Sequence, residues 1–459
     1  MDDREVDWAT NEFLDAELGD ERRARRLVQL VNALLNQPDS SLPAVFKTEA
    51  ELKAAYRFFD NPANEPQAIL ESHLLATLRR MRNSPLILAV QDTTYLDFTH
   101  HAATRGLGPT TSGRQQGLVM HSTLAITPEK VPLGVLQEKV WARDAETYAK
   151  LVDRKQRKIT EKESYKWLES LECVIELHKE LPGTHFVSVG DREADVYDLF
   201  IHERPEGVDL LVRAIRDRRI IDEEQRFLWA ALESAELGKT VEVQVPRTPK
   251  RSAHLAQLEV RWKEVTLCPP RHRTSEKLPS ITLWAVLARE TNTPENSEPV
   301  EWMLLASVPV TCAQEAIEKL QWYTCRWGIE VWHKVLKSGC RIESRQLDDA
   351  ENLIRMLAVF SIVAWRIIFA GMLARIMPQA SCEVFLEEDE WQALYCTIHQ
   401  TPTPPDQPPT LREAIRMIGR LGGHLGRKGD GEPGVQVLWV GFRRLYDLTD
   451  MYKIMRSPT

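Results

Sequence analysis

Apolar and polar positions along the chain predict helices first, then strands, then helices again. Apolar residues recur at helical spacing in 22–36, on the face opposite a group of arginines. They recur in the same way in 48–59, which ends at Asp60-Asn61-Pro62, a combination that stops helices. The two segments predict a small helical domain with one basic face. For this domain, DNA binding and a purely packing role both remain open.

Short apolar runs bounded by turn residues predict five strands in the next part of the chain. In order, these strands are 85–90, 118–126, 131–140, 184–189 and 208–214. Helical patterns at 163–181 and 194–202 separate the last three strands. The first three strands suit an antiparallel meander, whereas the later ones need parallel crossovers. Ribonuclease-H-like folds use this order of elements, so we expect an α/β domain of that kind.

The pattern changes again after residue 217. Four strand-like segments with turn-rich connections predict a β-rich insertion: 241–245, 256–265, 281–288 and 302–308. Helical patterns then return at 316–337 and 352–377, and a proline-rich linker precedes helices at 411–421 and 435–455. The segment 352–377 is the most apolar part of the chain, but three arginines interrupt it. We therefore expect a buried helix there and not a membrane span.

These patterns divide the chain into three kinds of region. Helical domains are expected at both ends, over 1–70 and 373–459. The α/β domain is expected in two parts, 71–217 and 311–372, separated by the insertion at 218–310. The predicted fold class is therefore α/β, with a β-rich insertion and helical flanking domains.

The segment 316–337 carries the most informative polar side chains. Four of them are three, four and seven positions apart and so share one face of the predicted helix: Tyr323, Arg326, Glu330 and Lys337. His333 and Lys334 lie beside this face. Such a face could hold one carboxylate on a metal ion while its cations bind phosphate. An ordinary solvated face with an ion pair between Arg326 and Glu330 is the alternative.

Two aspartates add to this picture, because Asp92 and Asp191 stand at or near the ends of the first and fourth predicted strands. Together with Glu330 they make three carboxylates without cysteine partners, a set that suits Mg²⁺ or Mn²⁺. For each aspartate, a turn-forming role at a strand end is the alternative. His121 lies in an apolar strand, where it could be a core histidine or could support the site. Asp195 is expected to be a cap or a surface charge.

Composition neither establishes nor excludes a nucleic-acid partner. The 459 residues are 43% hydrophobic and 27% charged, which is ordinary for a soluble protein of several domains. The formal net charge is −8, so a DNA-binding surface would have to come from local clusters of arginines. The seven cysteines lack metal-binding spacing, which disfavours zinc and fits a reduced cytoplasmic setting. The acidic N-terminus also lacks the apolar segment of a secretory signal.

At this point the motifs resemble those of the insertion-sequence-four family of cut-and-paste transposases, which includes the transposon-five transposase. Asp92 lies in QDTT, Asp191 lies in GDREADVY, and residues 323–337 carry the spacing Y-x2-R-x3-E-x6-K. Further similarity lies in LGDERRARRL near the N-terminus, AYRFFDNP at 55–62 and EWMLLASVPV at 301–310. The resemblance covers nearly the whole chain. One departure is Ala350, at a position where the family usually has proline.

The resemblance implies a DDE transposase with a ribonuclease-H-like catalytic domain and two Mg²⁺ (or Mn²⁺) ions in each active site. Asp92, Asp191 and Glu330 would be the catalytic metal ligands. The resemblance also suggests that four residues contact DNA phosphates: Tyr323, Arg326, Lys334 and Lys337. His333 and His121 would support the metal ligands. Trp302 would stack on a base flipped out of a DNA hairpin, with a plain core tryptophan as the alternative.

The same resemblance implies double-stranded DNA as the partner, both as terminal inverted repeats and as target. Four arginines match the end-binding positions of the N-terminal domain: Arg22, Arg23, Arg26 and Arg57. The C-terminal helices would form a homodimer that pairs two ends, and the enzyme would nick, make a hairpin, reopen it and join the end to target DNA. No membrane partner is expected, and the setting would be the bacterial cytoplasm at the nucleoid. Two alternatives remain: a non-catalytic repressor derived from a transposase, and a nuclease that cuts without joining.

Overall fold

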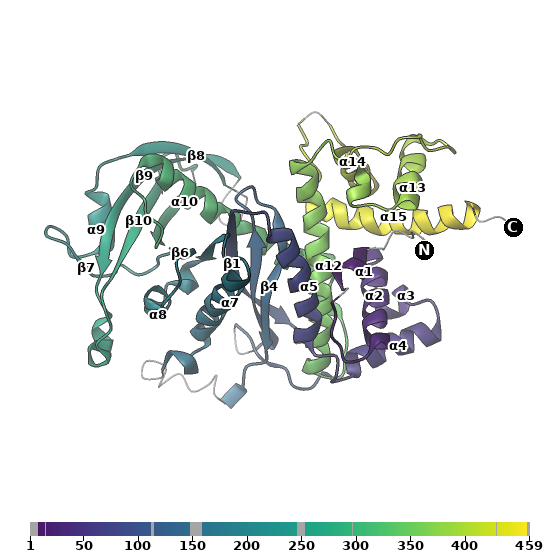
Figure 1. Cartoon of the computed structure of the whole chain (residues 1–459), viewed down its shortest axis with the longest axis horizontal. Coiled ribbons are helices and arrows are strands. Elements are labelled where there is room, and N and C mark those ends of the chain that lie inside the picture. The colour runs from purple at the N-terminus through teal and green to yellow at the C-terminus, as the bar shows by residue number, and fades with distance from the viewer. Residues whose placement is uncertain are drawn as a thin grey trace.

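The structure is a computed structural model of the chain, and it describes residues 8–13, 15–111, 114–146, 158–245, 253–295, 297–427 and 429–456. A large mixed sheet runs through one side of the molecule, and the helical N-terminal and C-terminal regions lie together on the other side (Figure 1). The fold is therefore mixed α/β with helical flanking regions, as the hydrophobic pattern predicts.

The N-terminal region consists of five helices: α1 (Trp8–Glu12), α2 (Glu21–Asn36), α3 (Leu42–Val45), α4 (Glu49–Asp60) and α5 (Pro66–Met81). The start of α2 is capped by Asp20, whose side chain accepts from the backbone N–H of Arg22. The start of α4 has a reciprocal capping box between Thr48 and Glu51. These helices confirm the two helical segments expected here. Helix α5, which was not predicted, packs against β4 and α12.

The centre of the sheet contains five of the strands expected from the sequence: β1 (Leu86–Asp97), β3 (Gln116–Ile126), β4 (Pro132–Trp141), β5 (His185–Gly190) and β6 (Val208–Arg213). Their spatial order is β4-β3-β1-β5-β6. The pairs β4–β3 and β3–β1 are antiparallel, whereas β1–β5 and β5–β6 are parallel. Helix α7 (Lys166–Glu180) and helix α8 (Tyr197–Ile201) lie in the connections to β5 and β6. The predicted meander and crossovers are confirmed.

The predicted β-rich insertion extends this same sheet. It contains β7 (Ile220–Ile221), α9 (Leu228–Glu233), β8 (Lys239–Val245), β9 (His254–Leu267), β10 (Ile281–Glu290) and β11 (Glu301–Ala306). Strand β11 pairs antiparallel with β6, where Leu305 lies opposite Val212. From β6 the sheet continues as β11-β10-β9-β7, and β8 pairs with β9. The insertion is thus joined to the central strands by backbone hydrogen bonds.

The remaining chain is helical: α10 (Ala313–Cys325), α11 (Trp327–Lys334), a π-helical turn η6 (Val335–Gly339), α12 (Ala350–Ile376), α13 (Glu388–His399), α14 (Leu411–Leu421) and α15 (Val435–Arg456). The helical segment predicted over 316–337 is confirmed, but its hydrogen bonding is irregular at Arg326, whose dihedral angles stay helical (φ −55°, ψ −32°). There the N–H of Arg326 bonds to the carbonyl of Tyr323, and the N–H of Ile329 bonds to the carbonyl of Arg326. Both bonds span three residues, which tightens the chain locally.

Helix α12 is the longest helix of the described chain and the centre of its packing. It is long and apolar enough to cross a membrane by composition alone, yet 78% of its most apolar window is buried inside the protein. It contacts α5, β4 and α2, and also α14 and α15. The expected buried helix is therefore confirmed. The domain boundary expected between 372 and 373 falls inside it.

A buried carboxyl group links α12 to the sheet. Glu138 on β4 accepts a hydrogen bond of 2.5 Å from the Ser361 hydroxyl on α12. Burial raises the pKa of Glu138 from 4.5 to about 7, although the bond from Ser361 opposes the shift. Folding therefore favours the protonated form of this side chain.

We expect Glu138→Gln to remove a pH-dependent loss of stability. Because the folded-state pKa lies above that of an exposed glutamate, wild-type stability should fall as the pH rises from about 4.5 to about 7, by up to about 3 kcal/mol. Denaturant unfolding at pH 5 and pH 8 should show a smaller difference for Glu138→Gln than for the wild type. The exposed Glu180→Gln is the control. An unchanged pH dependence in Glu138→Gln would contradict this assignment.

Candidate active site

Asp92 and Asp191 lie side by side because their strands run parallel and in register. Val90 on β1 pairs with Val189 on β5, and each aspartate follows two residues later on its own strand. Strand β1 continues to Asp97, so Asp92 is inside the strand and not after its end, as the sequence had suggested. Asp191 follows β5, and its Oδ1 accepts from the Glu193 N–H at 2.8 Å. The two carboxylates therefore occupy the same edge region of the sheet.

Glu330 comes to this region on α11, which packs against β1. Its Oε1 accepts a 2.6 Å hydrogen bond from Nη2 of Arg326, at the junction between α10 and α11. The Arg326 side chain is only 11% exposed, whereas that of Glu330 is 51% exposed. The ion pair that the sequence allowed is therefore present, but it lies at the edge of the core and not on a solvated face.

The charges of these side chains act on one another. The pKa of Asp92 is raised to about 7, with burial as the main cause; the charge of Arg326 opposes this shift, and the charges of Asp191 and Glu330 add to it. Burial would lower the pKa of Arg326, but Tyr323, Glu330 and Asp92 outweigh burial and raise it. Three carboxylates and one guanidinium thus share one electrostatic environment.

The donor set fits a hard divalent ion in its chemistry but not yet in its arrangement. All three predicted ligands offer carboxylate oxygens, which Mg²⁺ and Mn²⁺ prefer. In the described part of the chain, however, no three His, Cys, Asp or Glu side chains lie close enough together to hold one ion. Glu330 is directed to Arg326 instead. The metal site is therefore incomplete in this conformation.

The two histidines expected to support the ligands lie on opposite faces of β1. Nδ1 of His333 is 3.8 Å from Oδ2 of Asp92. Burial, with the charge of Lys337, lowers the pKa of His333 to about 3, so the ring is neutral. His121 instead bonds the Thr93 hydroxyl at 2.9 Å, and neighbouring residues of a strand face opposite ways. His333 therefore faces the Asp92 carboxylate, whereas His121 lies near the backbone of that residue.

Tyr323 and Trp302 are buried in an aromatic cluster with Trp327. The Trp302 ring centroid is 5.4 Å from that of Tyr323 and 6.0 Å from that of Trp327. Trp302 is 4% exposed and Tyr323 is 3% exposed. Tyr323 and Arg326 are buried at the edge of the core, where aromatic packing and the ion pair with Glu330 make their burial favourable. Trp302 has the surroundings of a core tryptophan in this conformation.

The two lysines expected to contact phosphate differ in their surroundings. Lys334 is exposed at the end of α11. Nζ of Lys337 donates to the backbone carbonyl of Tyr95 on β1 and lies 3.6 Å from the Glu343 carboxylate. Lys337 therefore also connects the π-helical turn to β1.

The four arginines of the expected DNA-end surface lie on α2 and α4, across α12 from β1 (Figure 1). Arg22 and Arg57 are exposed, and Arg23 and Arg26 are partly exposed. Nη1 of Arg23 donates to the Ala63 carbonyl at 3.1 Å, which joins the two helical segments. The structure places these arginines on a surface separate from the three carboxylates.

Asp195 is a site residue whose role the sequence did not indicate. It was expected to be a cap or a surface charge, but its side chain is fully buried. It accepts from the backbone N–H groups of Ile215 and Arg216 at 2.9 and 3.0 Å and from Nε of Arg218 at 2.9 Å. Asp195 thereby fixes the loop after β6 beside the segment that follows Asp191. In the sequence, the arginine cluster at 213–219 was the feature that could have indicated a buried partner for Asp195.

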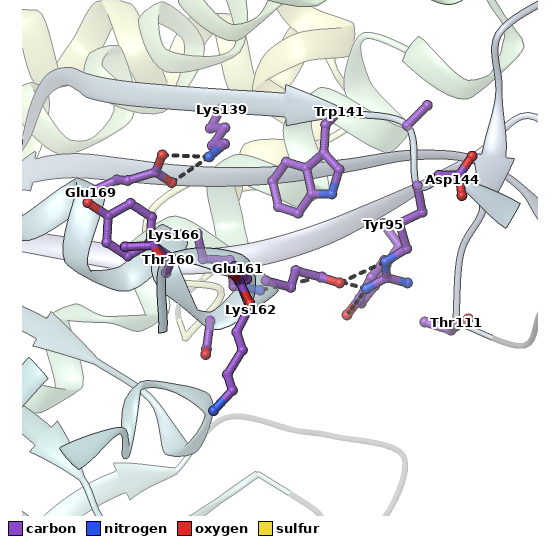
Figure 2. Close-up of a pocket in the computed structure, with 15 residues that line it drawn as sticks. Tyr95, Thr111, Lys139, Trp141, Asp144, Thr160, Glu161, Lys162, Lys166 and Glu169 are labelled. Carbon is purple, nitrogen blue, oxygen red and sulfur yellow. Dashed lines mark hydrogen bonds and ion pairs between the residues drawn. The ribbon is translucent and has the colours of Figure 1, made fainter. Parts of the chain in front are cut away.

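An open cleft of about 840 Å³ lies beside β1 and the start of α7 (Figure 2). Tyr95 and Trp141 line one side of it. Two of its cations are held by carboxylates: Arg143 forms two bonds to Glu163 at 2.6 and 3.0 Å, and Lys139 contacts Glu169. The cleft is close to β1, but its balanced charge does not single out an anionic ligand.

Comparison with known proteins gives two family matches. The family described as transposase DNA-binding matches residues 5–64, which include all four end-surface arginines. The family described as transposase Tn5 dimerisation domain matches residues 362–458. Among solved structures, the piggyBac transposase synaptic complex with hairpin DNA aligns over 98% of this chain and 78% of that chain, at 10% identity and a TM-score of 0.34. That likeness is too distant to support an argument.

Proposed function

Since the chain belongs to the Tn5-like transposases and carries their DNA-binding and dimerisation domains, we propose that it cuts and joins DNA at a site formed by Asp92, Asp191 and Glu330. The observation that carries this proposal is the register of the two aspartates on adjacent parallel strands, with the helix of Glu330 packed over them. We infer further that the five central strands and their helices form a ribonuclease-H-like domain, because their order and directions are those expected from the sequence.

The proposed chemistry is phosphoryl transfer on DNA. Asp92, Asp191 and Glu330 would together hold two Mg²⁺ or Mn²⁺ ions, which when bound activate the attacking oxygen and stabilise the leaving one. Arg326 and the lysines of α11 and the following turn would bind phosphates on either side of the cut. His333, neutral and buried, would keep the Asp92 carboxylate in place without competing for its charge.

The roles that we propose for the N-terminal and C-terminal helices follow the two family matches. The arginines on α2 and α4 would bind the terminal inverted repeats, mainly through phosphates. The C-terminal helices would pair two protomers, so that two ends are held together before cutting. Each end would be nicked, closed as a hairpin, reopened and joined to target DNA.

The experiment that tests this proposal uses DNA from either side of the reading frame that contains a pair of inverted repeats. The fragment is incubated with purified protein and Mg²⁺, beside Asp92→Asn, and the products are separated on a denaturing gel. We expect nicked, hairpin and joined DNA from the wild type and none from Asp92→Asn. The variant removes one charge from the proposed ligand set while keeping the side-chain shape.

Two other outcomes would favour the alternatives. Specific binding without cleavage in either Mg²⁺ or Mn²⁺ would indicate a non-catalytic repressor, the alternative that the incomplete ligand set favours. Cutting without joining would indicate a nuclease.

A further inference from the structure

Arg326 is bonded to one of the three carboxylates and lies close enough to a second for its charge to act on it. Its Nη2 is 2.6 Å from Oε1 of Glu330, and its positive charge also acts on Asp92. Its guanidinium carbon lies 5.7 Å from the centre of the Tyr323 ring, which holds the side chain from the other side. The guanidinium therefore neutralises part of the carboxylate charge from within the protein.

In this arrangement Glu330 is bonded to Arg326 and does not form a ligand group with Asp92 and Asp191. Its carboxylate is directed to Arg326, and no group of three possible ligands is formed in the described part of the chain. To join Asp92 and Asp191, Glu330 must give up the ion pair. That would leave a buried guanidinium without its partner, which is strongly unfavourable unless another anion replaces the carboxylate.

A phosphate is the anion that Arg326 is prepared to receive. Its Nε is buried without a hydrogen-bond partner, so the guanidinium still has an unused donor. Guanidinium groups bind phosphate through two parallel donors, which a single bond to Glu330 does not use. The junction between α10 and α11 at Arg326 also places this side chain where the helical hydrogen bonds are already irregular.

We propose that Arg326 is an internal counter-ion that withholds Glu330 from the metal site until a DNA phosphate takes over the guanidinium. The inference rests on the proposed function and adds a regulatory step at the same site. Phosphate binding to Arg326 releases Glu330, and Glu330 then completes the ligand set with Asp92 and Asp191. DNA and divalent ions must therefore bind cooperatively, each strengthening the other by the same factor. The free protein remains poorly loaded with metal.

The test measures Mn²⁺ binding from the loss of the free-ion electron paramagnetic resonance signal, first on the full chain without DNA. We expect Glu330→Gln to leave the weak DNA-free affinity within about twofold of wild type, because Glu330 is not yet a ligand. Arg326→Met should bind Mn²⁺ about tenfold or more tightly than wild type, because Glu330 is free. In the double variant this gain should disappear.

A matched control separates the ion pair from a general charge effect. Lys334→Met also removes one positive charge from α11, four residues after Glu330, but from an exposed side chain. We expect it to change the DNA-free Mn²⁺ affinity far less than Arg326→Met does. Circular dichroism confirms that each variant is folded, and the neutral Arg326→Gln replaces Arg326→Met if the latter is not.

Two results would overturn the proposal. One is a large loss of DNA-free Mn²⁺ affinity in Glu330→Gln, which would make Glu330 a ligand already. The other is equal affinity of wild type and the Arg326 variant. Neither measurement requires DNA cleavage, so a protein that binds metal as expected but does not cut DNA would refute the proposed function alone. With an inverted-repeat duplex added, wild-type Mn²⁺ affinity should rise about tenfold, and that of Arg326→Met should rise less.

Discussion

Glu330→Ala should leave binding of inverted-repeat DNA nearly unchanged and reduce strand cleavage on the order of a thousand-fold or more. The DNA-binding family match covers residues 5–64, which include the four arginines on α2 and α4 and none of the three carboxylates. The variant therefore removes a proposed metal ligand without touching the end-binding surface. Gel-shift titration measures binding, and a denaturing gel with Mg²⁺ measures cleavage.

Two companion variants make this result interpretable. Glu330→Gln keeps an acceptor for the buried Arg326 guanidinium, which alanine would leave unpaired, and it should lose cleavage just as strongly. Val331→Ala changes the neighbouring exposed side chain and should cut normally. Loss of DNA binding in a folded Glu330 variant, or substantial cleavage by both, would exclude a purely catalytic role.

Trp302→Ala should have the second largest effect, on both stability and one step of the reaction. The side chain is 4% exposed and packs between Tyr323 and Trp327, so its loss should lower the free energy of unfolding by about 3–5 kcal/mol. If it also receives a flipped base, hairpin formation should fall about tenfold more than the first nick, because stacking offsets the cost of unpairing. Denaturant unfolding and step-resolved gels measure the two effects.

The control for Trp302 is another large core side chain outside the site. Phe200 on α8 is 1% exposed, and Phe200→Ala should destabilise the fold while reducing nicking and hairpin formation equally. Trp302→Phe, which retains a ring, should lie between wild type and alanine at the hairpin step. Equal loss at both steps in a folded Trp302→Ala protein would leave Trp302 with a core role only.

The fold could be predicted from the sequence for those helices and strands that are buried along their whole length. The buried strands β5 and β6 and the apolar helix α12 follow from continuous hydrophobic runs, which burial on all sides requires. The continuation of β1 to Asp97 could not be predicted, because beyond Val90 the strand is polar and is held by pairing with β3. The connection of β11 to β6 is a long-range pairing that no local pattern encodes.

The candidate site was predictable in its residue types but not in its arrangement. The spacing of Tyr323, Arg326 and Glu330 placed them together, and the structure does bring the last two into contact. It did not reveal the irregular hydrogen bonding at Arg326, since no proline interrupts 316–337. Nor did it reveal the burial of Asp195, because a short polar segment gives no sign that Arg218 will fold over it.

Helix α12 has a consequence for the geometry of a paired complex. The Tn5 dimerisation match begins at residue 362, midway along a helix of 27 residues whose first half packs on the central strands and the N-terminal helices. A continuous helix of about 40 Å transmits rotation about its axis, which a flexible linker would not. Its residue count therefore sets the angular phase between the pairing surface and the three carboxylates. One residue more or fewer would turn one against the other by about 100°.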